Sequence, residues 1–200
     1  LLVNSLRMRP DRILVGEIRR KKQAQVLFEA MHTGHSVYAT LHADTAEQTV
    51  QRMLNPPIDV AEQMVKSVDV NVVAFRDRRR NFRRVFQVAE VAKTGYRRGG
   101  EETSLGANVI YEWDSEDDEI KKERESSQIH DKLELHAGMD RQEIAQNLED
   151  KEEVLQWMVD KQITDVDEVG KIIAEYYQDE EKVIEMARNR DDPYRIIDKY

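Results

Sequence analysis

Apolar positions near the start of the chain form two short runs with one helical stripe between them. The runs predict strands over Arg12–Val15 and Ser36–Thr40, and the stripe predicts a helix over Lys21–Thr33 that ends at Gly34. A strand–helix–strand order with this crossover length predicts parallel pairing and a right-handed connection. We expect the first strand to be buried, as strands of parallel sheets usually are. The stripe consists of Ala24, Leu27 and Met31, with Val26 and Ala30 beside it.

Capping and breaking residues predict two further helices. Asp44 or Thr45 is expected to cap a helix over Ala46–Met53, because their side chains can accept hydrogen bonds from its first turn. The segment Asn55-Pro56-Pro57 ends that helix. Asp59 is expected to cap the next one. The apolar side of this second helix consists of Val60, Met64, Val65 and Val68.

The middle of the chain reads as extended structure. Asp69–Phe75 and Val85–Val91 are predicted strands, and the basic turn between them favours antiparallel pairing. Thr94–Thr103 contains three glycines and is expected to be a linker or an exposed loop. Asn108–Trp113 and Glu119–Lys122 flank an acidic turn, which predicts a small hairpin.

The last third of the chain is predicted to be helical. Asp140 with Glu143 three residues later is typical of a helix start, and that helix should run to about Asp160. Thr164 and Asp179 mark two more starts. We expect buried faces on the first two helices, with Trp157, Tyr176 and Tyr177 in the core or at its rim. The expected faces are Ile144, Leu148, Leu155 and Met158, and then Val166, Val169, Ile173 and Tyr176.

Charge is divided unevenly between the two halves of the 200 residues. Residues 1–100 contain 18 basic and 10 acidic side chains (net +8), and residues 101–200 contain 13 and 30 (net −17). The shift predicts a boundary near Gly99-Gly100. We therefore expect three parts: a core over 1–95, a linker and β-hairpin over 96–127, and an acidic helical domain over 128–200.

Composition also excludes some classes of site. The chain has no cysteine, so disulfides and thiolate metal sites are ruled out, which fits a reducing cytoplasm. No apolar run approaches the roughly 18 residues of a membrane span. The chain opens on Leu1 without a signal-peptide pattern, and we expect it to be a fragment.

Two sequence blocks carry the candidate chemistry. Residues 9–19 read RPDRILVGEIR, and residues 32–45 read HTGHSVYATLHADT. Glu17 follows the first predicted strand and His42 follows the second. The carboxyl ends of parallel strands meet at one edge of a sheet, which is where ligands bind in open α/β folds. We expect Glu17 and His42 to lie at one site.

Each of these residues also has a purely structural interpretation. Glu17 could cap a helix or pair with Arg19, and His42 could be a satisfied structural histidine. His35 lies seven positions before His42 across the strand, so a regular strand would place the two on opposite faces. They are therefore not expected to form a metal-binding pair.

The two blocks resemble the Walker B motif and the histidine box of the secretion ATPase superfamily, which serves type II and type IV secretion, type IV pili and archaella. Their form is most similar to archaeal members, and the match runs from Leu1 to about Val91. The resemblance implies an α/β fold: the C-terminal half of a RecA-like P-loop ATPase core, with parallel strands and an antiparallel hairpin, followed by a small, mostly helical domain. The first half of that core, with its Gly-x-x-x-x-Gly-Lys-Ser/Thr loop, is expected to precede Leu1.

The resemblance also implies a function: hydrolysis of ATP with Mg²⁺ to power secretion or filament assembly. Glu17 would act on the attacking water and lie in the Mg²⁺ region, and His42 would approach the γ-phosphate. Other nucleotide-contacting positions would be Gly16, Arg19, His35 and Thr40. The implied assembly is a homohexamer docked on an integral-membrane platform protein at the cytoplasmic face. Without the phosphate-binding loop, the 200-residue chain alone should bind ATP poorly and not turn it over.

Two other functions remain open at this point. One is a RecA-like nucleic-acid translocase, which the basic turn Arg78–Arg84 would favour and the acidic second half disfavours. Nucleic acid is therefore an unexpected partner, and the turn should be solvated or docked on an acidic subunit. The other is a non-catalytic interaction module. Arginines near the first strand could reach a phosphate or a neighbouring subunit, or be solvated: Arg7, Arg9, Arg12 and Arg19.

Overall fold

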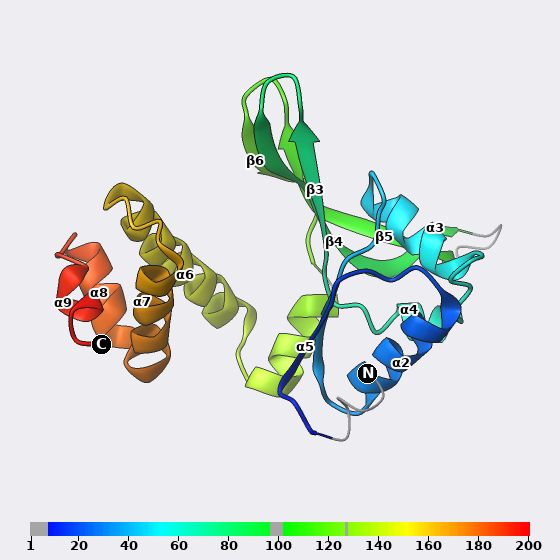
Figure 1. The fold of residues 1–200 in the computed structure, drawn as a ribbon, viewed down its shortest axis with the longest axis horizontal. Helices are drawn as coiled ribbons and strands as arrows, with labels where there is room; N and C mark the ends of the chain where they lie inside the picture. Colours follow the sequence, from blue (N-terminus) through cyan, green and yellow to red (C-terminus); the bar gives the residue numbers. More distant parts are fainter. Residues whose placement is uncertain (1–7, 97–101, 127) are drawn as a thin grey trace. The chain divides into compact units, whose positions relative to one another are not determined.

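The computed structural model describes residues 8–96, 102–126 and 128–200. The chain separates into two compact units, residues 1–129 and 130–200. The first contains a two-stranded and a four-stranded sheet with helices, and the second is helical (Figure 1). The predicted α/β fold class is thus confirmed.

The predicted strand–helix–strand unit is present as β1 (Arg12–Val15), α2 (Lys21–His32) and β2 (Ser36–Ala39). The two strands pair in parallel, from Arg12 opposite Ser36 to Val15 opposite Ala39. Gly34 follows α2 with φ of +87°, a backbone conformation that glycine adopts without strain. Ile13 of β1 packs on Leu27 and Ala30 of α2, so the helix covers one face of the strand pair.

The prediction that the whole first strand is buried is wrong. Ile13 is buried, but Leu14 is 78% exposed, and Tyr38 on β2 is 57% exposed. Side chains alternate along a strand, and within the described residues α2 covers only the Ile13 side. The other face of this two-stranded sheet is therefore apolar and open.

The predicted N-cap is confirmed for the helix that follows β2, and it is wrong for the helix after that. α3 (Ala46–Leu54) starts at Thr45, whose side chain accepts a hydrogen bond from the Gln48 amide. α4 is only Glu62–Val65 and is preceded by Ala61. Asp59 has φ of +48° and accepts a 2.7 Å bond from Lys21 Nζ, so it ties this loop to α2 and caps no helix.

The four-stranded sheet is antiparallel, in the order β3 (Asn71–Asp77), β4 (Phe82–Tyr96), β5 (Glu102–Asp114) and β6 (Glu119–Lys122). Both predicted hairpins are present. Residues 94–96 and 102–103 of the predicted linker are strand, because β4 and β5 pair from Gln87 opposite Glu112 to Tyr96 opposite Glu102. Gly99 and Gly100 lie outside the described residues. The strands on either side of them belong to one sheet, and the division between the two compact units falls at Ile129/His130.

A buried carboxylate fixes the start of α5 (Gln128–Ala137) to β4. Glu90 is 1% exposed and accepts hydrogen bonds from Ser126 Oγ at 2.9 Å and from the Gln128 amide at 3.1 Å. Asn108 Nδ2 on β5 donates a third, at 2.8 Å. A buried charge needs such donors, and together they hold this segment against the sheet.

The second compact unit contains α6 (Arg141–Asp160), α7 (Val166–Gln178), α8 (Glu180–Arg188) and α9 (Tyr194–Ile197). Asp140 and Asp179 cap α6 and α8 as predicted, and Asp165 caps α7 in place of Thr164. The short α9 was not predicted. The core of this unit consists mainly of Val154, Trp157, Met158, Ile163, Ile172, Tyr176, Val183, Ile184, Ile196 and Ile197.

The predicted buried faces of α6 and α7 are only partly right. Ile144, Met158 and Tyr176 are buried, but Leu148 and Leu155 are more than half exposed, and Val166 is 82% exposed. Trp157 is in the core, whereas Tyr177 is 78% exposed. Val154, Trp157 and Met158 of α6 belong to the core of this unit, and Leu148 and Leu155 lie outside it.

Candidate active site

The two sequence blocks meet beyond the carboxyl ends of β1 and β2. Past the last strand pair, the Ile18 amide donates to the Thr40 carbonyl at 2.9 Å. The Thr40 hydroxyl also donates to the Gly16 carbonyl. These two bonds hold the segments that carry Glu17 and His42 side by side. Gly16 and Thr40 thus act here through the backbone and a structural hydroxyl.

Glu17 lies between Arg19 and His42. Its Oε2 is 2.5 Å from Arg19 Nη2, and its Oε1 is 3.6 Å from His42 Nε2. The second distance exceeds that of an ordinary hydrogen bond, so imidazole and carboxylate are neighbours without a direct hydrogen bond. The side chain of Glu17 is 22% exposed, whereas those of Arg19 and His42 are 71% and 80% exposed. A partly shielded acid therefore sits beside two accessible donors.

The surroundings of Glu17 keep it ionised. The hydrogen bond from Arg19 is the main cause that lowers the pKa of Glu17, against a smaller opposing effect of desolvation. The charges of Arg19, His42 and Arg52 lower that pKa further. Arg52 lies in the last turn of α3 and was not predicted, because nothing in the local sequence links it to β1. An ionised carboxylate among cations can orient a water molecule and accept its proton.

The remaining predicted residues do not join this site. His35 precedes β2, at the opposite end of the strand pair, where its Nδ1 is 3.2 Å from the Ala30 carbonyl oxygen. It lines a surface pocket together with Arg9 and Asp11. Arg12 starts β1, at that same end, and Arg7 lies outside the described residues. Of the three arginines that the structure describes, Arg9, Arg12 and Arg19, only Arg19 forms an ion pair with Glu17.

The site offers one carboxylate to a metal ion. Among the described residues, no three His, Asp or Glu side chains gather in a way that could hold a metal. Mg²⁺ usually keeps several waters and binds through one or two carboxylates plus substrate phosphates. Glu17 fits this kind of site. Substrate phosphates and waters would supply most of the oxygens around the ion, and the protein would add one carboxylate oxygen, directly or through a bridging water.

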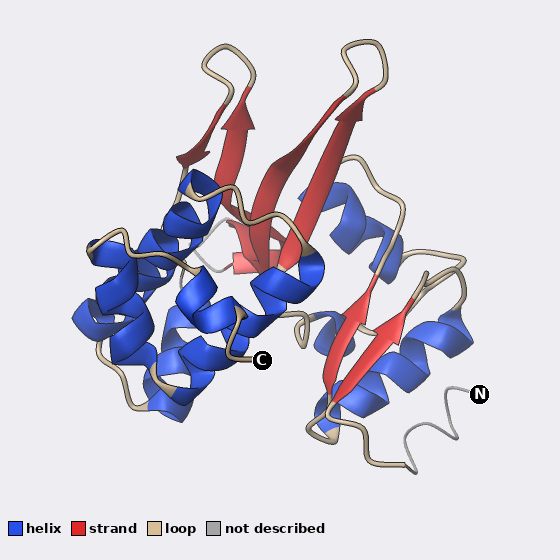
Figure 2. Cartoon of the chain, turned by 60° about the vertical axis from the view of Figure 1, so that its left-hand side comes forward, coloured by secondary structure: helices blue, strands red, loops and turns tan. Residues whose placement is uncertain are grey.

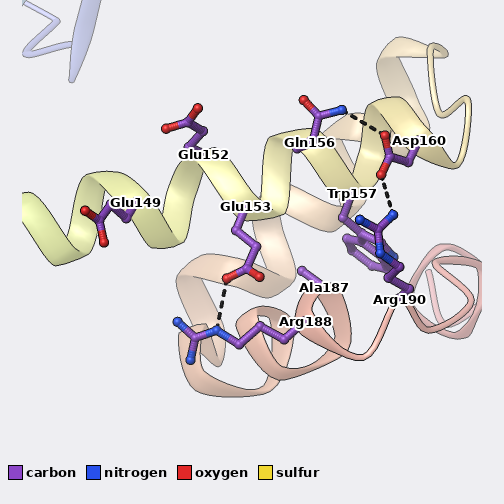
Figure 3. Close-up of a pocket in the computed structure, with 9 residues that line it drawn as sticks. All are labelled: Glu149, Glu152, Glu153, Gln156, Trp157, Asp160, Ala187, Arg188 and Arg190. Carbon is purple, nitrogen blue, oxygen red and sulfur yellow. Dashed lines mark hydrogen bonds and ion pairs between the residues drawn. The ribbon is translucent and has the colours of Figure 1, made fainter.

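A separate cavity in the helical unit lies between α6 and α8, over the edge of Trp157 (Figure 3). Several of its polar groups pair with one another: Glu153 accepts from Arg188 Nε at 3.0 Å, and Asp160 accepts from Arg190 Nη1 at 2.6 Å. Gln156 donates to Asp160 as well. None of its lining residues belongs to the two sequence blocks, and these internal ion pairs indicate a structural role.

Membrane insertion through a helix finds no support in the described part of the chain, where none of the helices combines the length and the apolar character of a membrane span.

Comparison with known proteins identifies the family of the chain. The family model described as type II/IV secretion system protein matches residues 1–169. The uncharacterized protein MJ0900 of Methanocaldococcus jannaschii is 31% identical over 183 residues, covering 89% of this chain and 32% of that protein. The type IV pilus assembly ATPase PilB of Pseudomonas aeruginosa is 48% identical over 50 residues, which cover 25% of this chain and 9% of PilB.

A conjugal transfer protein, TrbB of Rhizobium radiobacter, is 32% identical over 113 residues, covering 54% of this chain and 34% of TrbB. The chain thus spans less than two thirds of the length of each of these relatives. Because the family model covers most of the residues, the chain belongs to the type II/IV secretion system protein family.

Proposed function

We propose that the full-length protein is a motor ATPase that hydrolyses ATP with Mg²⁺ to power protein secretion or the assembly of a type IV pilus-like or archaellum-like filament. The observation that carries the proposal is the ionised Glu17 held between Arg19 and His42, where the ends of two parallel strands meet. Family membership supplies the context, and the likeness to a pilus assembly ATPase favours this kind of motor.

In the proposed mechanism, Glu17 orients the attacking water and accepts its proton. Arg19 keeps the carboxylate charged and is close enough to share its positive charge with phosphate oxygens. His42, which is mostly exposed beside Glu17, donates a hydrogen bond toward the γ-phosphate. Bound Mg²⁺ would offset phosphate charge near Glu17. Charge stabilisation and positioning are the main needs of phosphoryl transfer, and these residues meet both.

Six identical subunits would form a ring that docks on an integral-membrane platform protein at the cytoplasmic face of the membrane. Hydrolysis would move the subunits, and the platform would convert that motion into export or filament growth. The three-part division into residues 1–95, 96–127 and 128–200 is likewise a proposal about domains. Within it, residues 102–122 belong with the sheet of the motor core.

The test is ATP turnover by the full-length protein with Glu17→Gln. This change keeps the size of the side chain and removes its charge. We expect ATP binding to persist and kcat to fall by about 10²–10⁴-fold, the usual contribution of a general base. The matched control is Glu62→Gln, an exposed carboxylate on α4, which should leave turnover unchanged.

The same assay separates the proposal from nucleic-acid translocation. Single-stranded DNA should not change the rate of the unmodified protein. Strong stimulation by DNA would favour a translocase, and unchanged turnover by Glu17→Gln would remove Glu17 from the catalytic machinery.

A further inference from the structure

The four-stranded sheet carries charges of opposite sign at its two edges. In the order β3-β4-β5-β6, the turn between β3 and β4 lies at one edge and the turn between β5 and β6 at the other. Both turns lie at the same end of the sheet, beyond the ends of its strands (Figure 2). We call exposed Arg76, Arg78, Arg79, Arg80 and Arg83 the basic tip, and exposed Glu116, Asp117, Asp118 and Glu119 the acidic tip.

Contacts between the two hairpins fix these tips relative to each other. Arg84 Nη2 is 2.5 Å from Asp118 Oδ2, and Trp113 Nε1 donates to the same carboxylate at 2.9 Å. The Trp113 ring stacks on Phe75 with centroids 5.7 Å apart. The hairpins therefore form one arm with a defined basic edge and a defined acidic edge.

Most of the tip charge is not used inside the molecule. In the described part of the chain, the five arginines of the basic tip form no ion pairs, and neither do Glu116 and Glu119. Apolar side chains are exposed on both edge strands: Val72 (57%) and Phe75 (40%) on β3, and Ile120 (48%) on β6. Arginine and aromatic residues beside exposed apolar groups are typical of protein interfaces.

The opposite charges of the two tips indicate which kind of partner the arm can bind. An extended polyanion, such as a nucleic acid or an anionic membrane, would approach the acidic tip along with the basic one and be repelled there. Two copies joined through like edges, with their arms aligned, would set arginines against arginines. Copies joined head to tail set the basic tip of one against the acidic tip of the next.

We propose that the arm is an interface between copies of this chain, in which the basic tip of each subunit contacts the acidic tip of its neighbour. Such a heterologous contact closes into a ring when the rotation between subunits closes. This inference rests on the proposed ring of identical subunits. It adds the surface through which neighbouring subunits would contact each other head to tail.

The test uses two charge reversals in the full-length protein, Arg79→Glu/Arg80→Glu and Glu116→Arg/Glu119→Arg. Sedimentation with a bound non-hydrolysable ATP analogue measures ring assembly. Each reversal alone sets like charges together at every junction and should weaken assembly about tenfold or more, because close interfacial charge pairs couple by at least that amount. The control is Lys22→Glu/Lys66→Glu, a reversal of two exposed lysines outside the arm, which should assemble normally.

An equal mixture of the two reversed proteins gives the decisive result. The first protein has two carboxylates in place of arginines of its basic tip, and the second has two arginines in place of carboxylates of its acidic tip. In an alternating assembly the two altered tips face each other with opposite charges and the two unaltered tips keep their natural contact, so the mixture should assemble although each protein alone assembles poorly. This recovery also shows that both variants are folded. Unchanged assembly of the reversed proteins overturns the interface, and so does a loss that mixing does not restore, because the arginines would then contact another partner.

The unmodified protein separates this inference from the proposed function. If both reversed proteins still form active rings, the proposed interface is wrong and the proposed ATPase function is unaffected. A protein that turns over ATP without forming any ring overturns the interface and the ring but leaves the ATPase standing. Loss of anionic-vesicle or DNA binding in Arg79→Glu/Arg80→Glu, with assembly intact, would assign the basic tip to that polyanion and overturn the proposal.

Discussion

Glu17 owes its charge to a neighbour only two positions away in the sequence. Arg19 forms a 2.5 Å ion pair with it and is the main cause of its lowered pKa. Both side chains belong to one sequence block, so this contact is local and does not depend on distant packing. In the proposed mechanism it lets Glu17 act as a base at a lower pH than an ordinary glutamate would.

This gives a prediction about the pH dependence of turnover. Replacing Arg19 with Gln removes the group that lowers the pKa of Glu17, so the pKa rises toward its ordinary value. Glu17 then becomes protonated at a higher pH as the solution is acidified. The acidic limb of the kcat/KM profile of the full-length protein should therefore move to higher pH. Lys22→Gln, which changes an exposed cation on α2, should leave that limb in place.

The meeting of Glu17 with His42 could be predicted from sequence, whereas the approach of Arg52 could not. Parallel pairing of β1 and β2 follows from element order, and it brings residues just beyond both strands to one edge. Arg52 comes from α3, and its effect on the pKa of Glu17 depends on how that helix packs. His35 was assigned to the nucleotide by family resemblance, and the register of β2 places it at the other end.

At the scale of elements, the starts of helices were predicted better than their buried faces. Thr45, Asp140 and Asp179 cap as expected, because capping is a contact between residues two or three apart. The buried side of α6 depends on where α7 and α8 lie, and exposed Leu148 and Leu155 mislead a rule based on periodicity. Glycine spacing likewise suggested a linker where long-range pairing makes β4 and β5 continuous strands.

Two valines on α6 test which face is the core. Val154 is 5% exposed and Val159 is 66% exposed. Val154→Ala should lower the free energy of unfolding by about 2 kcal/mol, since it removes buried methyl groups and leaves a cavity. Val159→Ala should change it by less than about 0.5 kcal/mol. Urea unfolding followed by circular dichroism checks both, and equal effects would contradict the assigned core.

The cap of α6 gives a second prediction. Asp140 accepts hydrogen bonds from the amides of Gln142 at 2.8 Å and Glu143 at 2.9 Å. Asp140→Ala leaves these donors without that partner and should cost about 1 kcal/mol of stability. Glu149→Ala, in the middle of the same helix and exposed, serves as the control and should be close to neutral. A loss no larger than that of the control would rule out the capping role.

At the scale of the molecule, one buried acid ties the C-terminal residues to the helical unit. Glu175 on α7 is 2% exposed and contacts Lys182 Nζ at 2.5 Å, Lys199 Nζ at 2.8 Å and the Tyr200 hydroxyl at 2.9 Å. Hydrogen bonds from Lys182, Lys199 and Tyr200, in that order of effect, lower the pKa of Glu175 to about 2. The acid thus connects α7, α8 and the end of the chain.

The lowered pKa makes the stability of this unit depend on pH. Glu175 binds a proton more readily when unfolded, so its contribution is fully present above its ordinary pKa of 4.5 and is lost as pH falls toward 2. Glu175→Gln should be less stable than the unmodified chain at pH 7, and the difference should shrink between pH 4.5 and 2. Thermal unfolding across this range measures it; a difference independent of pH would assign the effect to packing.

The 200-residue chain by itself should not turn over ATP. The sequence contains no Gly-x-x-x-x-Gly-Lys-Ser/Thr loop, so the backbone cradle and the lysine for the phosphates are missing from it. We expect no turnover above background from the chain alone, with the full-length protein as the positive control in the same assay. Turnover by the chain at the full-length rate would mean that Glu17 and His42 work without such a loop.

The open face of the β1–β2 pair has a practical consequence for handling the chain in the laboratory. Leu14 and Tyr38 present apolar surface beside strand edges that no described strand pairs with, a combination that promotes aggregation at high protein concentration. Yield in solution, more than thermal stability, should therefore limit work on the isolated chain. A single lysine in place of Leu14 should raise the concentration at which it precipitates while leaving its melting temperature nearly unchanged.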